Sequence, residues 1–307
     1  MRAPEKLLKR MEWSVLRRLD GVLLGDYRSL FRGTGLDLAD IREYQPHDDV
    51  RHIDWNVTAR QQTPYVRQYH EDREICAWFL LDLSPSMDFG SNERTKRELL
   101  AEVVALLGQL FSRQGNRIGA IIYSAGIDHV IRPGTGTRHL LHVLDRITRQ
   151  PAPESAPETN LSDLLKSALS LCKRRSVVFV ISDFISTPGW SKPMAMLAER
   201  HESIAIRLLD PLESSLPDLG LLTVQDAETG EQLQVDTHDF GFRQRYEKIC
   251  EQAEAELVEQ LTRAGTDVLE LATDDDLFDA MMRFIRMRRP VPQAGRPGPV
   301  HELEATP

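Results

Sequence analysis

The residues best suited to chemistry are hard oxygen donors, most of which follow apolar stretches of the chain. They are two carboxylates and three hydroxyls: Asp82, Ser84, Ser86, Thr159 and Asp183. The first three stand at alternate positions after the apolar run 75–81, and the last follows the apolar run 177–181. Small divalent cations prefer oxygen ligands. The set therefore predicts a site for Mg²⁺, or for another divalent cation such as Mn²⁺ or Ca²⁺.

The charge of this set indicates what such a site would do. Only two of the five side chains carry a full negative charge, so a bound divalent cation would keep net positive charge and an open coordination position. An acidic side chain of a partner protein suits that position. We therefore expect a protein-binding site, and we assign no catalytic residue and no organic cofactor.

A rival hypothesis makes Asp82 a nucleophile, as in haloacid-dehalogenase-like phosphotransferases, with Lys173 and Asp183 assisting Mg²⁺ chemistry. Such an enzyme needs a second Asp two residues after the nucleophile, where this chain has Ser84. It also needs a further acid shortly after Asp183, which the sequence does not offer. We favour binding over catalysis for these reasons.

The elements that must position these residues form an α/β pattern. Three runs are apolar throughout: 75–81, 118–123 and 177–181. Two more, 204–209 and 268–271, are apolar apart from one charged residue each. Such runs are typical of parallel strands that helices cover on both faces. Helical periodicity predicts the intervening helices 99–111, 137–149, 161–172, 192–199, 240–264 and 275–288, and shorter signals predict an edge strand at 128–132 and a hairpin with arms 221–225 and 232–235. In doubly wound sheets of this kind, ligands bind beyond the carboxyl ends of the strands.

Composition divides the chain into three parts. Residues 1–73 should hold an amphipathic helix over 7–19, followed by a charged, aromatic segment in which we expect strands and loops rather than helices. Residues 74–289 should form the sheet domain. Residues 290–307 are rich in Pro, Gly and polar residues, which predicts a disordered tail.

Charge and cysteine usage exclude several classes of protein. The chain has 38 Lys and Arg against 47 Asp and Glu, a net charge of -9, which argues against a nucleic-acid partner. No apolar stretch of about 18 residues predicts a membrane segment, and the charged first residues lack the core of a secretory signal. The three cysteines are far apart in sequence and indicate reduced thiols. We therefore expect a cytoplasmic protein.

A second group of nitrogen and oxygen donors lies in the segment before the sheet domain. It consists of His47, Asp48, Asp49, His52 and Asp54. The spacing is not that of a structural zinc site. We favour a solvated turn with Asp–Arg pairs, and a second metal site is the alternative.

The five oxygen donors resemble the metal-ion-dependent adhesion site of von Willebrand factor A-like domains. That site has a D-x-S-x-S motif, a later Thr and a later Asp, which match Asp82, Ser84, Ser86, Thr159 and Asp183 in order. The resemblance implies a doubly wound, mostly parallel von Willebrand factor A-like sheet over residues 74–289. It also implies that these five residues hold the metal.

The preceding segment resembles a bacterial family called domain of unknown function 58. The usual pattern R-E-Y-x-P-G-D-D-x-R-x-I-D-W is matched from Arg42 to Trp55, with His47 where Gly is common. Members of that family often accompany MoxR-type AAA+ ATPases in chaperone-like maturation or assembly of other proteins. The resemblance therefore implies an adaptor that works with such an ATPase.

Overall fold

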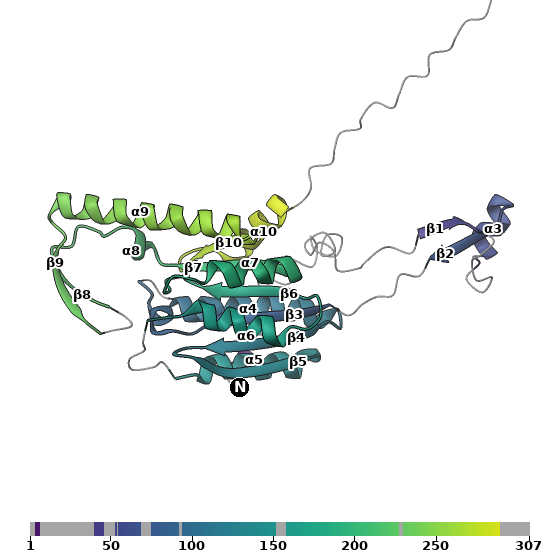
Figure 1. Ribbon diagram of the computed structural model, residues 1–307, viewed down its shortest axis with the longest axis horizontal. Coiled ribbons are helices and arrows are strands. Elements are labelled where there is room, and N and C mark those ends of the chain that lie inside the picture. Colours follow the sequence, from purple (N-terminus) through teal and green to yellow (C-terminus); the bar gives the residue numbers. More distant parts are fainter. Residues whose placement is uncertain are drawn as a thin grey trace, which may run out of the picture.

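The architecture is organised around one six-stranded sheet. It is described from a computed structural model of the 307-residue chain, for residues 4–6, 40–45, 53, 55–68, 75–91, 94–151, 158–226 and 230–288. The strand order across the sheet is β10-β7-β6-β3-β4-β5 (Figure 1). The strands are β3 (Cys76–Asp82), β4 (Arg117–Tyr123), β5 (Ile127–Gly134), β6 (Val177–Ser182), β7 (Glu202–Leu209) and β10 (Asp267–Ala272).

The sheet is parallel except at one edge. β3 pairs in parallel with both β4 and β6, and the parallel pairing continues through β7 to β10. Only β5 runs antiparallel, beside β4. This confirms the expected α/β fold with a mostly parallel sheet, and it places the apolar run 75–81 at the centre.

Helices cover both faces of the sheet. One face packs against α4 (Lys96–Arg113), α5 (Gly136–Arg149) and α10 (Leu277–Arg288). The other packs against α6 (Leu161–Leu171), α7 (Ser191–Arg200) and α9 (Phe240–Arg263). Because successive side chains of a strand point to opposite faces, Phe79 enters the first core and Leu80 the second. This two-sided burial explains why the central strands show no polar alternation.

Aromatic contacts fix the register in the first core. The rings of Phe79 and Phe179 stack with centroids 5.2 Å apart, and Phe111 of α4 meets Phe179 edge-on at 5.8 Å. At the start of α4, Thr95 accepts a hydrogen bond from the N–H of Glu98, and Glu98 accepts one from the N–H of Thr95 in return. This capping box fixes where α4 begins, directly after the loop that follows β3.

The predicted helices and strands of the sheet domain are confirmed, with boundary differences of a few residues. The hairpin is formed by β8 (Leu221–Gln225) and β9 (Gln232–Asp236). It hangs from the amino end of α9, outside the sheet (Figure 1). Two short elements complete the domain, the 3-10 turn η3 (Pro85–Asp88) and α8 (Pro211–Ser214).

The part before the sheet contains an element that the sequence did not indicate. β1 (Asp40–Glu43) and β2 (Tyr65–Gln68) pair antiparallel, as expected for a segment of strands. Between them, however, α3 (Trp55–Gln61) is a helix, so the preference for strands and loops was wrong there. Its end is held by the Thr58 carbonyl, which accepts from Gln62, and by the Thr58 hydroxyl, which accepts from the N–H of Tyr65 at 3.0 Å.

Three predictions concern residues that the structure leaves undescribed. The whole expected helix over 7–19, the donor cluster from His47 to Asp54 and the tail 290–307 lie outside the described residues. They stay predictions.

Candidate metal centre

The candidate site lies where two neighbouring strands end side by side. Asp82 is the last residue of β3, and Asp183 directly follows β6. The connection from β3 leads to β4 on one side, whereas β6 leads to β7 on the other. This divergence is a topological switch point, where open α/β sheets bind ligands.

Both oxygens of the Asp82 carboxylate are hydrogen bonded, and the side chain is fully buried. The N–H of Ser84 donates to Oδ1 at 3.0 Å, and the hydroxyl of Ser182 donates to Oδ2 at 2.6 Å. Ser182 also accepts from the N–H of Phe184 at 2.9 Å, and Phe184 adopts φ 61. A positive φ is unfavourable for a bulky residue, so the chain leaves β6 in a strained turn that this serine supports.

The two motif serines lie together beside Asp82. Ser84 immediately precedes η3 and Ser86 lies within it, and their hydroxyl oxygens are 3.2 Å apart. Both are buried, Ser84 completely. The tight turn of η3, in which the N–H of Met87 bonds to the carbonyl of Ser84, folds the second serine back toward the first. Ser84 and Ser86, which are two residues apart in the sequence, thus have neighbouring hydroxyls in the structure.

Thr159 reaches the same edge of the sheet through its main chain. Its carbonyl accepts from the N–H of Thr187 and from the hydroxyl of Ser186, each at 2.9 Å, and both donors follow β6. The residue is 1% exposed. The N-cap of α6 is Asn160 rather than Thr159, so helix capping does not explain this threonine.

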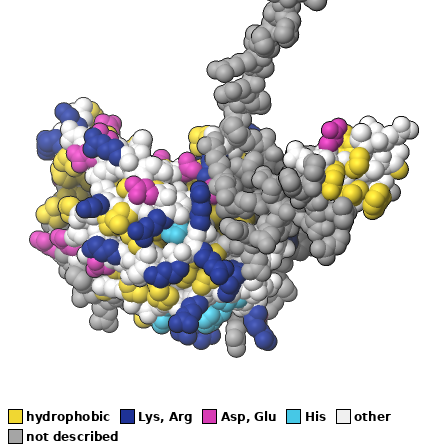
Figure 2. All heavy atoms as spheres, turned by 45° about the vertical axis from the view of Figure 1, so that its right-hand side comes forward, with side chains coloured by type: hydrophobic (Ala, Val, Ile, Leu, Met, Phe, Trp, Pro, Cys, Tyr) yellow, Lys and Arg dark blue, Asp and Glu magenta, His cyan; other side chains and the backbone are white. Residues whose placement is uncertain are grey.

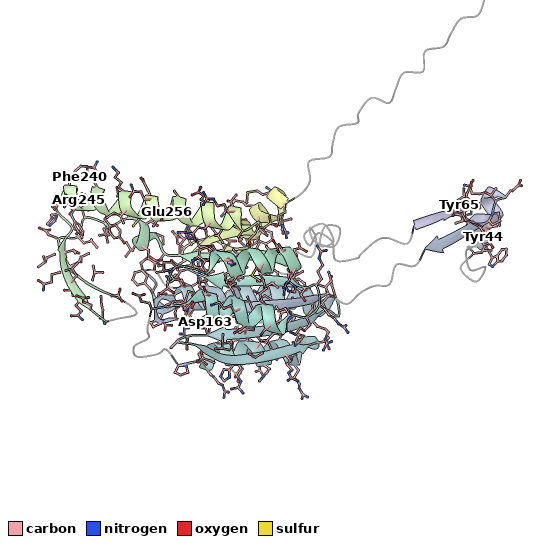
Figure 3. All side chains as sticks on the ribbon, in the orientation of Figure 1. Tyr44, Tyr65, Asp163, Phe240, Arg245 and Glu256 are labelled. Atoms are coloured by element: carbon pink, nitrogen blue, oxygen red, sulfur yellow. The ribbon has the colours of Figure 1, made fainter. Side chains whose placement is uncertain are left out.

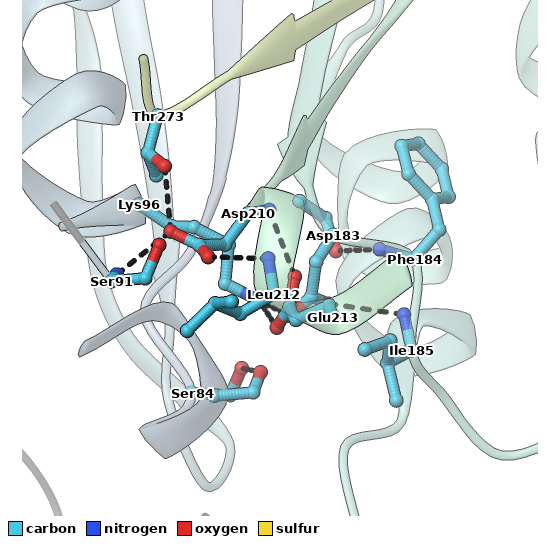
Figure 4. Close-up of polar contacts among 12 residues, drawn as sticks. Ser84, Ser91, Lys96, Asp183, Phe184, Ile185, Asp210, Leu212, Glu213 and Thr273 are labelled. Atoms are coloured by element: carbon cyan, nitrogen blue, oxygen red, sulfur yellow. Dashed lines mark hydrogen bonds and ion pairs between the residues drawn. The ribbon is translucent and has the colours of Figure 1, made fainter. Parts of the chain in front are cut away.

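Asp183 is tied to a buried lysine. The N–H of Ile185 donates to its Oδ1 at 3.0 Å, and Lys96 Nζ donates to its Oδ2 at 2.7 Å (Figure 4). Lys96 is fully buried at the first position of α4, and its ammonium also contacts Glu213 of α8 at 2.6 Å. Sequence reasoning missed this lysine because it stands between Arg94 and Arg97 in a charged stretch that looks exposed.

The charged groups of the site carry an excess of negative charge. Burial, and then the neighbouring Asp183 charge, raise the pKa of Asp82 to about 6. Burial alone would lower the pKa of Lys96, but Asp183 and Glu213 outweigh it and the pKa is raised. With one ammonium against the carboxylates of Asp82, Asp183 and Glu213, the group has a net charge of about -2 at neutral pH. A divalent cation would balance that charge.

A third buried carboxylate, Asp210, holds α8 next to this site. Asp210 accepts from the N–H of Ser91 at 2.8 Å, the hydroxyl of Thr273 at 2.6 Å and the N–H of Leu212 at 3.0 Å (Figure 4). Burial alone would raise the pKa of Asp210, but these hydrogen bonds lower it below its ordinary value. Because the partners come from the loops after β3, β7 and β10, they fix the helix that carries Glu213.

The donor set fits a hard cation only if the hydroxyls take part. Within the described residues, no group of three or more His, Cys, Asp or Glu side chains could hold a metal ion. The structure brings Asp82, Ser84, Ser86 and Asp183 to one buried edge and ties Thr159 to it through the Thr187 loop. These are the residues that would hold the ion.

Lys173, which the rival phosphotransferase hypothesis places near Asp82, lies elsewhere in the structure. Lys173 follows α6 and precedes β6, so it lies at the amino end of the sheet, opposite to Asp82, and it is exposed. The buried lysine of the site is Lys96 instead. Lys173 cannot assist chemistry at Asp82.

The fold and the site define an α/β protein with a parallel sheet whose carboxyl edge gathers buried acids and hydroxyls. The model of the family "Protein of unknown function DUF58" matches residues 40–256, and the chain belongs to this family. The uncharacterized protein Rv1480 of Mycobacterium tuberculosis is 35% identical over 282 residues, which cover 92% of this chain and 89% of the relative. An uncharacterized protein of Mycobacterium avium is 36% identical over 124 residues, 40% of this chain and 73% of the relative.

Solved structures with a related arrangement are more distant. BatB from Bacteroides thetaiotaomicron is 14% identical with a TM-score of 0.43, and covers 70% of this chain and 98% of its own. An aerotolerance-related membrane protein from Bacteroides fragilis is 12% identical with a TM-score of 0.45 and the same coverage. Likenesses of this size carry no argument about function.

One further finding concerns the described helices. Among the helices that the structure describes, none has both the length and the apolar character to cross a membrane.

Proposed function

We propose that this chain is a non-enzymatic protein-interaction module that depends on a divalent cation. The cation, Mg²⁺ or an ion such as Mn²⁺ or Ca²⁺, is held by Asp82, Ser84, Ser86, Thr159 and Asp183 in a von Willebrand factor A-like fold. The observation that supports this most is the burial of Asp82 beside Asp183, which raises the pKa of Asp82 to about 6. Two buried carboxylates with one ammonium need a further cation.

The metal serves to bind an acidic side chain of a partner protein. Two full charges on five donors leave the ion with net positive charge, and small hard cations keep exchangeable waters. A carboxylate from a partner replaces one of these waters. Lys96 adds positive charge next to Asp183, which strengthens the attraction for an incoming anion.

The cellular role follows from the family. The chain belongs to DUF58, and the resemblance described under Sequence analysis implies that members of this family accompany MoxR-type AAA+ ATPases. This supports an adaptor that acts in protein maturation or complex assembly, in the cytoplasm. The acidic ligand of the metal then belongs to the ATPase or to the protein that it remodels.

Metal binding is tested by calorimetry and thermal unfolding of the chelator-treated full chain, titrated with Mg²⁺, Mn²⁺ or Ca²⁺. The wild type should bind one ion and gain thermal stability, and Asp82→Ala and Ser84→Ala/Ser86→Ala should not. Asp163→Asn is the matched control, since Asp163 is an exposed acid on the first turn of α6 (Figure 3). Equal binding by Asp82→Ala would contradict the proposed ligand set.

Partner binding is tested by affinity capture from extract of the native cell, with and without chelator. Proteins that depend on the site should be recovered by the wild type with metal but not by Asp82→Ala/Ser84→Ala. Recovery of the same proteins in all cases would contradict metal-mediated binding. Hydrolysis of a generic phosphate ester with Mg²⁺, lost in Asp82→Ala, would instead establish the phosphotransferase alternative.

A further inference from the structure

The hairpin at the amino end of α9 exposes apolar side chains outside the sheet. We call residues 218–226 and 230–242, which contain β8, β9 and the turn into α9, the hairpin arm. Its large exposed apolar side chains are Leu219, Leu221, Val224, Leu233 and Phe240, between 43% and 69% exposed. Phe240 lies at the end of α9 far from the sheet (Figure 3). β8 and β9 pair only with each other among the described strands.

The apolar face of the hairpin is covered at its base and open at its tip. Directly opposed residues share a face, and the register pairs Leu222 with Val235 and Val224 with Leu233. Val235, near the base, is 8% exposed, whereas Val224 is 43% and Leu233 64% exposed. The described part of the chain therefore leaves the apolar side chains at the tip largely open to solvent.

The charge of the arm indicates what it binds. Residues 218–242 contain six acids and no Lys or Arg: Asp218, Asp226, Glu228, Glu231, Asp236 and Asp239. Arg243 and Arg245 lie just beyond this segment, and they pair with Asp218 at 3.2 Å and with Asp239 at 3.9 Å. Asp226 and Glu231, on either side of the turn, are exposed and make the surface beside the apolar tip negative.

The opposite end of the molecule has the opposite charge. Exposed basic side chains stand at the amino ends of the strands: Arg113, Arg117, Lys173, Arg174, Arg175 and Arg200. Figure 2, which turns the right-hand side of Figure 1 forward, shows Lys and Arg side chains scattered over the described part of that side. Binding of the arm to this end of a second copy would be head-to-tail and open-ended unless a ring closes.

We propose that the hairpin arm docks a segment of a different protein in which Lys or Arg residues flank apolar side chains. The apolar side chains cover Val224 and Leu233, and the basic ones pair with the surrounding acids. The same charge repels nucleic acids and anionic membrane surfaces. This interaction needs no metal, so it is independent of the function proposed for the sheet edge.

The direct test is binding of fluorescent peptides to the full chain, followed by anisotropy. The probes are a short peptide of alternating Lys and Leu, one of alternating Glu and Leu, and one of alternating Lys and Ser. The first should bind, more weakly at higher salt, and the other two should not. Val224→Ser/Leu233→Ser and Asp226→Asn/Glu231→Gln should each weaken binding of the first peptide at least tenfold.

Matched controls separate the arm from the rest of the surface. Val130→Ser on β5 removes an apolar side chain of almost the same exposure, 42%, and Glu199→Gln on α7 removes an exposed acid. Neither variant should change the affinity for the Lys–Leu peptide. Addition of chelator and the Asp82→Ala substitution should also leave this affinity unchanged. The proposal is overturned if the arm variants bind the Lys–Leu peptide as tightly as the wild type, or if no peptide binds.

Replacement of Leu233 by a photo-crosslinking amino acid in the native cell shows what kind of molecule binds the arm. Crosslinked peptides should be rich in Lys, Arg and apolar residues and should come from another protein. Crosslinks to lipid, to nucleic acid, to this chain's own basic end or to nothing would overturn the proposal. Because the metal site plays no part, failure here leaves the proposed function of the sheet edge untouched.

Discussion

The carboxyl edge of the sheet and the hairpin arm are both acidic, but they place their charge in opposite environments. At the edge, Asp82 and Asp183 are at most 4% exposed and all four of their oxygens accept hydrogen bonds. On the arm, Asp226 and Glu231 stand in solvent. A buried charge is costly unless a partner balances it, whereas an exposed charge costs little and attracts ligands. Substitutions at the edge should therefore change stability, and substitutions on the arm should change only binding.

The largest effect is expected from loss of the buried ammonium. Lys96→Met leaves Asp183 buried without its counter-ion, and removal of one partner from a buried pair costs about 3–5 kcal/mol. Urea unfolding of the chelator-treated protein measures this change. The control is Lys166→Met, since Lys166 is 64% exposed and its ion pair with Asp163 is long, at 3.7 Å. This variant should change the free energy of unfolding by no more than about 0.5 kcal/mol. Equal losses in the two variants would mean that burial of Lys96 is irrelevant.

The same variant should respond more strongly to metal. In Lys96→Met a divalent ion no longer meets the repulsion of a neighbouring ammonium, so the rise in melting temperature on adding Mg²⁺ should exceed that of the wild type. A smaller rise would indicate that Lys96 helps to build the ion site instead of competing with the ion.

Neutralising Asp82 should stabilise the metal-free protein, whereas loss of Lys96 should destabilise it. Because the folded-state pKa of Asp82 is raised to about 6, the folded form binds its proton more tightly than the unfolded form, whose pKa is about 3.9. The ionised residue therefore destabilises the metal-free protein above pH 6, and this penalty is relieved as the pH falls from about 6 to about 4. At pH 7, Asp82→Asn should stabilise the chelator-treated protein by about 1–3 kcal/mol.

The pH profile distinguishes this cause from a packing effect. The advantage of Asp82→Asn, measured by urea unfolding, should shrink steadily between about pH 6 and pH 4. With saturating Mg²⁺ at pH 7 the order should reverse, because only the wild type binds the ion. A difference that is constant over this pH range would reject the charge explanation.

The sequence predicted the central parts of both regions because their signals are local. Apolar runs such as 177–181 reveal strands that are buried on both faces, and the alternation of Asp82, Ser84 and Ser86 survives as neighbouring oxygens. Helical periodicity predicted α4 to α10 of the sheet domain apart from the single turn of α8. The hairpin was predicted from its turn residues and the strand patterns beside them.

The partners of the site could not be predicted, because they are set by tertiary packing. Lys96 contacts Asp183 across 87 residues of sequence, and Ser182 contacts Asp82 across 100. No local pattern separates the fully buried Lys96 from Arg94 and Arg97 beside it, which are only partly buried. The helix α3 was missed for a different reason: it is only seven residues long, and β-branched residues such as Val57 lower helix propensity.

Loss of the Ser182 hydroxyl should have an intermediate effect. Ser182→Ala leaves Asp82 Oδ2 and the N–H of Phe184 without this partner. An unsatisfied buried group costs about 1–3 kcal/mol, and the pKa of Asp82 should move further up. Urea unfolding at pH 5 and pH 7 measures both effects, since the loss should be smaller at the lower pH. Ser170→Ala, at an exposed hydroxyl of α6, is the control.

The smallest change in stability is expected from substitutions on the hairpin arm. Val224→Ser/Leu233→Ser should alter the free energy of unfolding by no more than about 0.5 kcal/mol, because these side chains already contact water. The same Val→Ser change at Val178, which is fully buried in β6, should cost about 3 kcal/mol or more, because it removes apolar contacts and buries a hydroxyl. Urea unfolding of both variants measures the contrast. A large loss from the arm variant would mean that Val224 and Leu233 belong to a folding core, and then they could not serve as a docking surface.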